Sequence, residues 1–457
     1  MHRFVLFGIS LLISMLLLGN TRAANWPQFR GPQACGVDSS KPAPIHWDLK
    51  NSENILWRTP IPGLAHSSPI LWGDRIYVTT ALQNNKPELK VGLYGNPISV
   101  ENEGSQQWRL LAIDSKNGQL IWNTLGYEKA PEINRHPKST HCNPTPATDG
   151  KRIAAIFGSE GLFCFDMDGK LKWHKSLGPM DSGWYVDPTA QWGFASSPVI
   201  HDGKVAVLCD VQTNSFVALF DLADGRELWR TSRADVPTWG TPTVVKVGDR
   251  DQILINGWRH TAAYDFLTGK EMWRLKGGGD IPVPTPIVAG DMAYFTSGHG
   301  LGGRPVRAIR LNSRGDITPE SVDGTNESIA WVQPRSGNYM QTPILVQDHL
   351  YCCYDSGILT CFDAHTGKID YSERLGTGSE GFTSSPVSDG RNLYIASEVG
   401  NVYLVPATTN FSIIATNKLN ETCMATPLIA DGMLVYRTRE HLVAIGGKGA
   451  GILTSDK

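Results

Sequence analysis

Side chains that can bind ligands recur in this sequence at two kinds of position. The first kind stands shortly before a Ser/Thr-Pro pair and comprises His66, His141, Trp192, Trp239 and Gln341. The second kind follows an apolar, strand-like run and comprises Glu160, Asp210, Trp258, Arg259, His299, Asp355, Glu398 and Glu440. Indole rings stack on planar groups, and carboxylates and cations hold polar substituents. If the two kinds of position converge, they form a pocket for a polar ring such as a quinone or a sugar.

From these positions we predict a ligand-binding set, which is His66, His141, Trp192, Asp210, Trp239, Arg259, His299 and Glu398. The alternative is a hydrated rim that binds nothing in particular, because polar residues are expected on any face rich in loops. Imidazole is a common metal ligand, but His66, His141 and His299 come from distant parts of the chain. We therefore predict no metal site, and no residue is assigned a catalytic role.

The cysteines also argue against metal or haem chemistry. The eight are Cys35, Cys142, Cys164, Cys209, Cys352, Cys353, Cys361 and Cys423, with no CxxC or CxxCH spacing among them. This spacing excludes haem c attachment and a zinc ribbon. Several lie in strand patterns such as LYCCYD, where a buried thiol behaves as a small hydrophobic residue.

The N-terminus indicates export. His2 and Arg3 precede an apolar run, and Thr21-Arg22-Ala23 follows it with small residues, so residues 1–23 are interpreted as a cleaved secretory signal peptide. An uncleaved anchor is the alternative. No cysteine follows directly to carry a lipid, and no later stretch can span a bilayer, so we expect the periplasm or the cell envelope. A net charge of −2 gives no electrostatic signature of nucleic-acid binding.

A repeat organises the chain that must position these side chains. Ser/Thr-Pro followed by an apolar run occurs at Pro69, Pro146, Pro198, Pro242, Pro286, Pro343, Pro386 and Pro427, at spacings of 41 to 77 residues. Later in most units an apolar strand ends in Asp, a turn closes at Gly, and a second strand carries an aromatic residue. LFCFDMDGKLKW and TAAYDFLTGKEMW are two examples. Such a period matches a four-stranded propeller blade.

Each residue of this motif has a physical role. The aspartate accepts backbone N–H groups in the turn, and the glycine takes a positive φ. The aromatic residues offer large apolar faces that fit between neighbouring sheets, and the tryptophans among them are Trp57, Trp122, Trp173, Trp229, Trp273 and Trp331. The fifth unit is degenerate, because Arg310 stands where aspartate is expected.

We therefore predict an all-β, eight-bladed propeller of four-stranded antiparallel blades over residues 54–447. Residues 24–53 form an N-terminal extension, and residues 448–457 form a tail. The last unit has only three strands of its own, and the N-terminal strand around Trp57 is predicted to supply the fourth and close the ring. An insertion at 82–107, with 127–143 and 178–192, is expected to overhang one mouth of the channel as a lid or a partner-binding surface.

The Asp-x-x-Thr-Gly-x-x-x-Trp motif at 265–273 resembles the tryptophan-docking repeat of quinoprotein (PQQ-like) β-propellers. The segments NWPQFRGP and TSGHGLGGRPVRAIRL resemble exported proteins of this family from planctomycete-type bacteria. The resemblance implies two branches of function. One is the PQQ- and calcium-dependent alcohol or sugar dehydrogenases, and the other is non-catalytic propellers such as the scaffold lipoprotein of the outer-membrane assembly machinery.

The dehydrogenase branch implies a vicinal disulfide and a calcium site. Cys352 and Cys353 lie in a strand pattern that disfavours such a disulfide, and no calcium-ligand set can be matched. We therefore favour a non-catalytic binding or scaffold module, with an envelope protein or a carbohydrate as partner. PQQ and calcium remain the cofactors of the alternative, and a polysaccharide-binding propeller is a second alternative.

Overall fold

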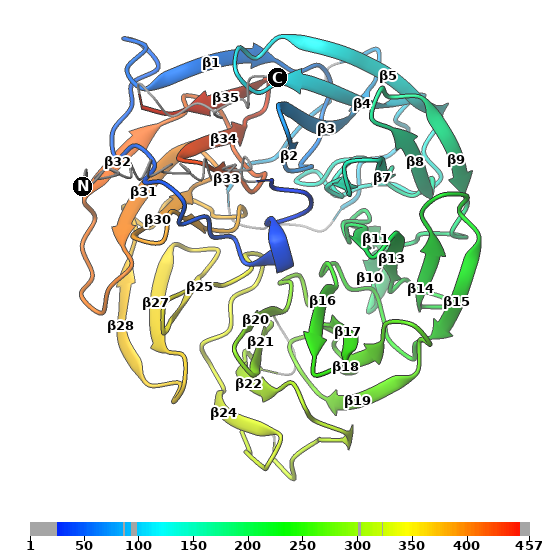
Figure 1. The fold of residues 1–457 in the computed structure, drawn as a ribbon, viewed down its shortest axis with the longest axis vertical. Coiled ribbons are helices and arrows are strands. Elements are labelled where there is room, and N and C mark those ends of the chain that lie inside the picture. The colour runs from blue at the N-terminus through cyan, green and yellow to red at the C-terminus, as the bar shows by residue number, and fades with distance from the viewer. Residues whose placement is uncertain (1–24, 86, 93–97, 300–302, 322, 448–457) are drawn as a thin grey trace, which may run out of the picture.

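The computed structural model describes residues 25–85, 87–92, 98–299, 303–321 and 323–447, and in them the chain forms a closed ring of β-sheets around a central axis (Figure 1). The predicted signal peptide and C-terminal tail lie outside these residues. Within them there is no α-helix, and a single 3₁₀-helix, η1 (Pro32–Ala34), precedes the strands. The predicted all-β, eight-bladed propeller is confirmed.

Each blade is an antiparallel sheet whose first strand lies nearest the channel, and blades are numbered in chain order. Blade 1 contains β2 (Ile70–Trp72), β3 (Arg75–Leu82), β4 (Gln106–Asp114) and β5 (Leu120–Lys129). Blade 2 contains β6 (Ala147–Thr148), β7 (Arg152–Ile156), β8 (Leu162–Asp166) and β9 (Leu171–Lys175). Blade 3 contains β12 (Val199–His201), β13 (Lys204–Cys209), β14 (Phe216–Asp221) and β15 (Glu227–Ser232). Blade 4 contains β16 (Thr243–Val247), β17 (Arg250–Ile255), β18 (His260–Asp265) and β19 (Glu271–Lys276).

The second half of the ring repeats this order. Blade 5 contains β20 (Ile287–Ala289), β21 (Met292–Thr296), β22 (Val306–Arg310) and β24 (Ile329–Gln333). Blade 6 contains β25 (Ile344–Val346), β26 (His349–Cys353), β27 (Ile358–Asp363) and β28 (Ile369–Arg374). Blade 7 contains β29 (Val387–Ser388), β30 (Asn392–Ala396), β31 (Asn401–Pro406) and β32 (Ala415–Lys418). Blade 8 contains β33 (Leu428–Ala430), β34 (Met433–Arg437), β35 (His441–Ile445) and β1 (Ile55–Pro60). A separate hairpin, β10 (Gly183–Trp184) with β11 (Asp187–Gln191), lies between blades 2 and 3.

The outer turn of each blade is built as the motif predicts. In blade 4, Oδ1 of Asp265 accepts the backbone N–H of Thr268 at 2.9 Å, and Gly269 takes a φ of +68°. Trp229 of blade 3 lies over this turn and donates from Nε1 to the carbonyl of Phe266 at 3.0 Å. A methyl group on Gly269 would come within 2.5 Å of that indole ring. The tryptophan of one blade thus packs on the glycine of the next.

Blade 5 departs from this pattern because its turn lacks the aspartate. Residues inserted before β24 form β23 (Gly315–Asp316), which crosses to blade 4 and pairs parallel with β19 through Trp273 and Gly315. Ile317 then packs in the core around Trp273. The sheet of blade 4 therefore has five strands, where four were predicted.

Ring closure is confirmed in the last blade. β1 pairs antiparallel with β35, so the N-terminal strand completes the sheet formed by the C-terminal strands (Figure 1). Trp57 of β1 donates from Nε1 to the carbonyl of Ser115 at 2.8 Å and lies over Gly118 of blade 1. The closing strand thus also joins blade 8 to blade 1.

The segment before β1 crosses the centre of the ring, where Figure 1 shows it in dark blue. Trp26 bridges to Leu71 of blade 1, and Val37 bridges to Ser388 of blade 7. Between them, the fully buried guanidinium of Arg30 donates to the carbonyls of Pro343 at 2.9 Å and Pro386 at 2.8 Å. We call residues 25–38 the plug, since they tie together the inner strands of blades 1 and 7 and the residues that begin blades 6 and 7 across one end of the channel.

Candidate functional site

The loops that lead into the first strand of each blade surround a cavity of about 170 Å³ in the central channel. Phe29 of the plug lines it together with residues contributed by the blades. The predicted residues His66, Trp192 and Trp239 lie in its wall. This cavity is the candidate site, and a concave channel mouth is where propellers and other folds ordinarily hold ligands.

A ring of hydroxyl groups encircles the cavity. Each is the Ser or Thr that precedes a strand-starting proline, and the eight are Ser68, Thr145, Ser197, Thr241, Thr285, Thr342, Ser385 and Thr426. Seven of the backbone N–H groups in this ring donate to the hydroxyl of the next blade, at 2.9 to 3.3 Å. We call this ring the hydroxyl collar. From the sequence, the Ser/Thr-Pro pairs are interpreted only as the starts of strands. The Ser or Thr that recurs before each proline is nevertheless the sequence signal of this hydroxyl ring.

Aromatic rings form one wall of the cavity. The ring centroids of Trp192 and Trp239 are 5.3 Å apart, and Trp184 of the β10–β11 hairpin stacks on Trp192 at 6.2 Å and 10°. Trp239 is buried, packs with Ile281 and Tyr339, and donates from Nε1 to the carbonyl of Gly193 at 2.9 Å. This wall is an apolar surface able to stack on a ligand group.

The opposite side of the mouth carries cations and histidines. Lys138 is buried and forms an ion pair with Glu398 of blade 7, with Nζ and Oε1 2.6 Å apart. Oε1 of Glu398 also accepts the hydroxyl of Thr383. Nε2 of His66 donates to the carbonyl of Lys138 at 2.8 Å, and burial, with nearby Arg437, Arg135 and Lys138, lowers the pKa of His66 to about 4. The carboxylate of Glu398 is therefore already paired with the ammonium group of Lys138.

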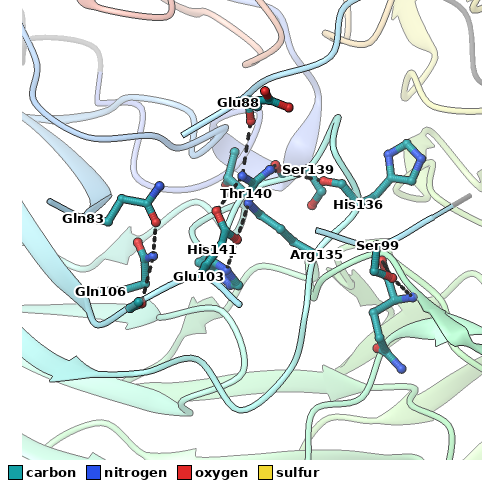
Figure 2. Close-up of polar contacts among 12 residues, drawn as sticks. Gln83, Glu88, Ser99, Glu103, Gln106, Arg135, His136, Ser139, Thr140 and His141 are labelled. Atoms are coloured by element: carbon teal, nitrogen blue, oxygen red, sulfur yellow. Dashed lines mark hydrogen bonds and ion pairs between the residues drawn. The ribbon is translucent and has the colours of Figure 1, made fainter. Parts of the chain in front are cut away.

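The described parts of the insertion, residues 82–85, 87–92 and 98–107, contact loops at the mouth. Gly92 donates its N–H to Oε2 of Glu398 at 2.6 Å, and Oγ of Ser99 accepts the N–H of Gln191 at 2.7 Å. Glu103 lies between Arg135 and His141, at 2.7 Å and 2.8 Å (Figure 2). Desolvation alone would raise the pKa of Glu103, but hydrogen bonds from His141 and Arg135 lower it to about 2. His141 thus anchors the insertion, and its side chain is not among those lining the cavity.

The carboxylate of Asp210 is paired with the guanidinium of Arg233 between blades 3 and 4. Arg233 donates to its two carboxylate oxygens at 2.7 and 3.1 Å, and the hydroxyl of Thr238 donates at 2.9 Å. Desolvation raises the pKa of Asp210 to about 6, although Arg233 opposes the shift. The carboxylate of Asp210 therefore has a structural role: it connects the end of β13 to the loop after β15.

The other two predicted residues lie at the rim on blades 4 and 5. The side chain of Arg259 is exposed, and its backbone N–H donates to Oδ1 of Asp235 at 3.1 Å. The ring of His299 packs against the cavity-lining Tyr339 with the two rings tilted by 36° and their centroids 4.6 Å apart. The structure thus places His66, Trp192, Trp239 and His299 in or beside the cavity, and it uses His141, Asp210 and Glu398 in ion pairs.

Sequence reasoning missed Glu103, Arg135 and Lys138. Each makes its main contact with a residue from a different loop, as Lys138 does with Glu398. No spacing motif relates such pairs, so only the folded ring reveals them.

A calcium-bound quinone requires several converging oxygen ligands. Within the described ranges, no group of three or more His, Cys, Asp or Glu side chains is placed to hold a metal ion. The thiols of Cys352 and Cys353 are free and buried on β26. The carboxylates of Asp210 and Glu398 are already paired with Arg233 and Lys138. The donor set therefore does not fit a calcium–quinone centre.

Comparison with solved structures gives the same ring in proteins of both expected branches. BamB from Moraxella catarrhalis is 13% identical, with a TM-score of 0.58 over 86% of this chain and 99% of that one. A europium-containing methanol dehydrogenase is 12% identical, with a TM-score of 0.58 over 92% and 89%. The quinohemoprotein alcohol dehydrogenase from Comamonas testosteroni is 12% identical, with a TM-score of 0.60 over 95% and 82%. At such identities these likenesses establish the fold alone.

Fold and repeat together define a PQQ-type β-propeller protein. The family model described as "Outer membrane protein assembly factor BamB" matches residues 45–212 and 213–446, and the chain belongs to this family. Comparison with curated proteins gives no match. In the part of the chain that the structure covers, no helix has the length and apolar character needed to cross a membrane.

Proposed function

We propose that this protein is an exported, non-catalytic binding module of the cell envelope, whose ligand or partner group occupies the mouth of the central channel. The observation that carries the proposal is the chemistry of the cavity wall. It combines closely packed indole rings with the hydroxyl collar, and the carboxylates of Asp210 and Glu398 outside this wall are paired with cations of the protein. Such a wall provides contact area and hydrogen bonds for a ligand.

The envelope location rests on the leader-like N-terminus and on family membership. The described parts of the insertion 82–107 add a surface beside the cavity, and two apolar side chains in them, Val91 and Ile98, are exposed. A protein partner can therefore contact the rim while one of its side chains enters the cavity. The alternative ligand for the same binding function is a carbohydrate that stacks on the ring of Trp192.

The test compares binding with turnover. The purified protein is titrated with PQQ and Ca²⁺ and assayed for dye reduction with alcohols and sugars, and in parallel the quenching of tryptophan fluorescence is followed with glycans and small aromatic probes. We expect no dye reduction, and quenching that Trp192→Ala weakens. Trp192 is half-buried, so the variant should keep the fold, whereas Trp239 is buried in the wall and Trp239→Ala would destabilise it. Turnover with PQQ would overturn the proposal and favour the dehydrogenase.

A further inference from the structure

The hydroxyl collar is a ring of hydrogen-bond donors that the protein itself leaves unused. All eight side chains line the one cavity, and each is at most 5% exposed. Seven of their oxygens accept a backbone N–H from the preceding blade. Among the described residues, none of the eight hydroxyls donates its own proton to a protein atom. Because most of the oxygens are already occupied as acceptors, the collar offers O–H groups to whatever enters the cavity.

The rest of the cavity wall has the same bias toward donors. Nε1 of Trp192 is buried and has no acceptor among the described residues. No Asp or Glu of the described ranges lines the cavity, and the ammonium of Lys138, which does line it, is paired with Glu398. A ligand that brings acceptor atoms therefore satisfies this wall, whereas a cation would find no carboxylate in it.

Two buried guanidinium groups beside the collar lack a carboxylate partner. Arg30 of the plug donates to the carbonyls of Pro343 and Pro386, which directly follow two collar residues. Arg437 of β34 donates at 3.2 Å to the carbonyl of Ser67, which directly precedes a third. Both guanidiniums are buried, and no carboxylate of the described residues lies at ion-pair distance from either. Since buried charges are weakly screened, they place the collar in a positive potential.

The imidazole of His66 responds to this potential. His66 lines both the cavity and a small side pocket that contains Arg437. Burial lowers the pKa of His66 to about 4, the charges of Arg437, Arg135 and Lys138 contribute in the same direction, and its bond to the carbonyl of Lys138 opposes the shift. Charges that disfavour a proton on this wall favour an anion beside it.

The remaining wall is apolar and selects among anions. Trp239, Ile281, Val283 and Met424 line the same cavity as the collar. A strongly hydrated inorganic anion would lose its water there and gain nothing from these side chains. An organic carboxylate can place its oxygens on the O–H groups and its carbon skeleton on the apolar wall, and O–H groups form short, strong hydrogen bonds to carboxylates.

We propose that the cavity binds the carboxylate group of an organic ligand, with the hydroxyl collar and Nε1 of Trp192 as its hydrogen-bond donors. The carboxylate belongs either to a free organic acid or to an acidic side chain of a protein partner, since both present the same group. The donors come from the protein alone, so binding should need no metal ion. This inference rests on the proposed binding function and names the chemistry of what enters the cavity.

The experiment compares phenylacetate with phenylacetamide, a neutral analogue of the same shape, by titration calorimetry on the full mature chain at neutral pH with EDTA present. We expect phenylacetate to bind at least tenfold more tightly, because only its carboxylate is charged. A second pair consists of the blocked peptides acetyl-Gly-Phe-Asp-Gly-amide and acetyl-Gly-Phe-Asn-Gly-amide. It presents the same two groups on a side chain, so it distinguishes an acidic partner from a free acid.

Ser68→Ala is the variant that tests the collar. The hydroxyl of Ser68 lines the cavity and holds no hydrogen bond to a described residue, so its removal takes a donor from the cavity without breaking a bond within the protein. It should weaken the acid that binds at least threefold and the neutral analogue less than twofold. The matched control is Ser196→Ala, because the hydroxyl of Ser196 is also buried without a partner but does not line the cavity. This control should change the affinity for the acid less than twofold.

Tighter binding of the acid in either pair supports the inference, and the pair that shows it identifies the source of the carboxylate. Equal affinities of acid and neutral analogue in both pairs would overturn it, as would equal effects of Ser68→Ala and Ser196→Ala or a requirement for Ca²⁺. If a glycan or a neutral aromatic probe binds in a Trp192-dependent way while neither acid binds, the carboxylate site is wrong and the binding module stands. If no probe binds at all, both are wrong.

Discussion

At the scale of single residues, the mouth is held together by charges that lie where water cannot screen them. The Lys138–Glu398 pair is 5% and 1% exposed, and it joins the loop before blade 2 to blade 7. Removing one member of such a pair leaves the other buried and uncompensated. These contacts therefore matter for stability far more than the ion pairs on the outer strands.

Glu398→Gln should lower the free energy of unfolding by about 3 kcal/mol, because the ammonium of Lys138 stays buried without its carboxylate. The double variant Lys138→Met/Glu398→Gln should recover part of that loss. Urea unfolding measures both. Asp316→Asn, which breaks the exposed pair with Lys276, should cost less than about 1 kcal/mol. Equal effects of Glu398→Gln and Asp316→Asn would contradict the assignment.

The histidines make the mouth sensitive to acid. Burial, aided by nearby cations, lowers the pKa of His66 and of His136 from 6.5 to about 4. Between pH 6.5 and 4 the unfolded chain binds protons that the folded chain excludes, so stability falls as the pH falls. Glu103, with a pKa of about 2 against 4.5, continues the loss below pH 4.5.

The melting temperature should accordingly drop between pH 7 and pH 4, and His136→Asn should flatten that drop. Nδ1 of His136 accepts the N–H of Lys138 at 3.0 Å, and the amide oxygen of asparagine can accept the same bond without titrating. His365→Asn, at an imidazole that is 71% exposed, is the control and should leave the profile unchanged. Identical profiles for the unmodified protein and His136→Asn would rule out this source of acid sensitivity.

At the scale of elements, the turn glycine and the tryptophan of the preceding blade form one packing unit. Gly367 has a φ of +71°, and a methyl group there would come 2.6 Å from the ring of Trp331. Gly290 has a similar φ of +58° with open space around it. The two glycines have similar backbone conformations, but only Gly367 packs against a tryptophan ring.

Gly367→Ala should therefore destabilise the protein by about 2–4 kcal/mol, and Gly290→Ala by about 1 kcal/mol, the cost of a left-handed alanine. Chemical unfolding of both variants gives the comparison. Should the two losses be equal, close packing of Trp331 on the turn would not be what constrains Gly367.

The elements also show how far the sequence alone leads. The Asp, Gly and Trp of motifs such as 265–273 have local roles, so their spacing predicted turns, strands and the ring. β23 was not predicted, because its place beside β19 depends on where an insertion of blade 5 meets blade 4. The same holds for the site: Trp192 and His66 were predicted from their loops, but Lys138 and Glu103 acquire their roles only from distant neighbours.

At the scale of the whole molecule, the first strand β1 and the last strand β35 share one sheet, so folding of the last blade requires the first strand. Deleting residues 24–62 should abolish cooperative unfolding, because β35 would be left as an open edge and Trp57 would no longer join blade 8 to blade 1. Calorimetry tests this. Adding residues 24–62 as a separate peptide should restore the transition, and a truncated chain with an unaltered melting temperature would contradict strand closure.

The plug has a consequence for how molecules come and go. Because residues 25–38 lie across one end of the channel, and Phe29 lines the cavity, a guest that enters from the loop side must leave by the same route. Dissociation of one ligand molecule then competes with binding of the next at the same opening. A bulky group attached to the ligand stays outside the channel on the loop side. If the channel binds a ligand, the plug therefore fixes which end of that ligand faces inward.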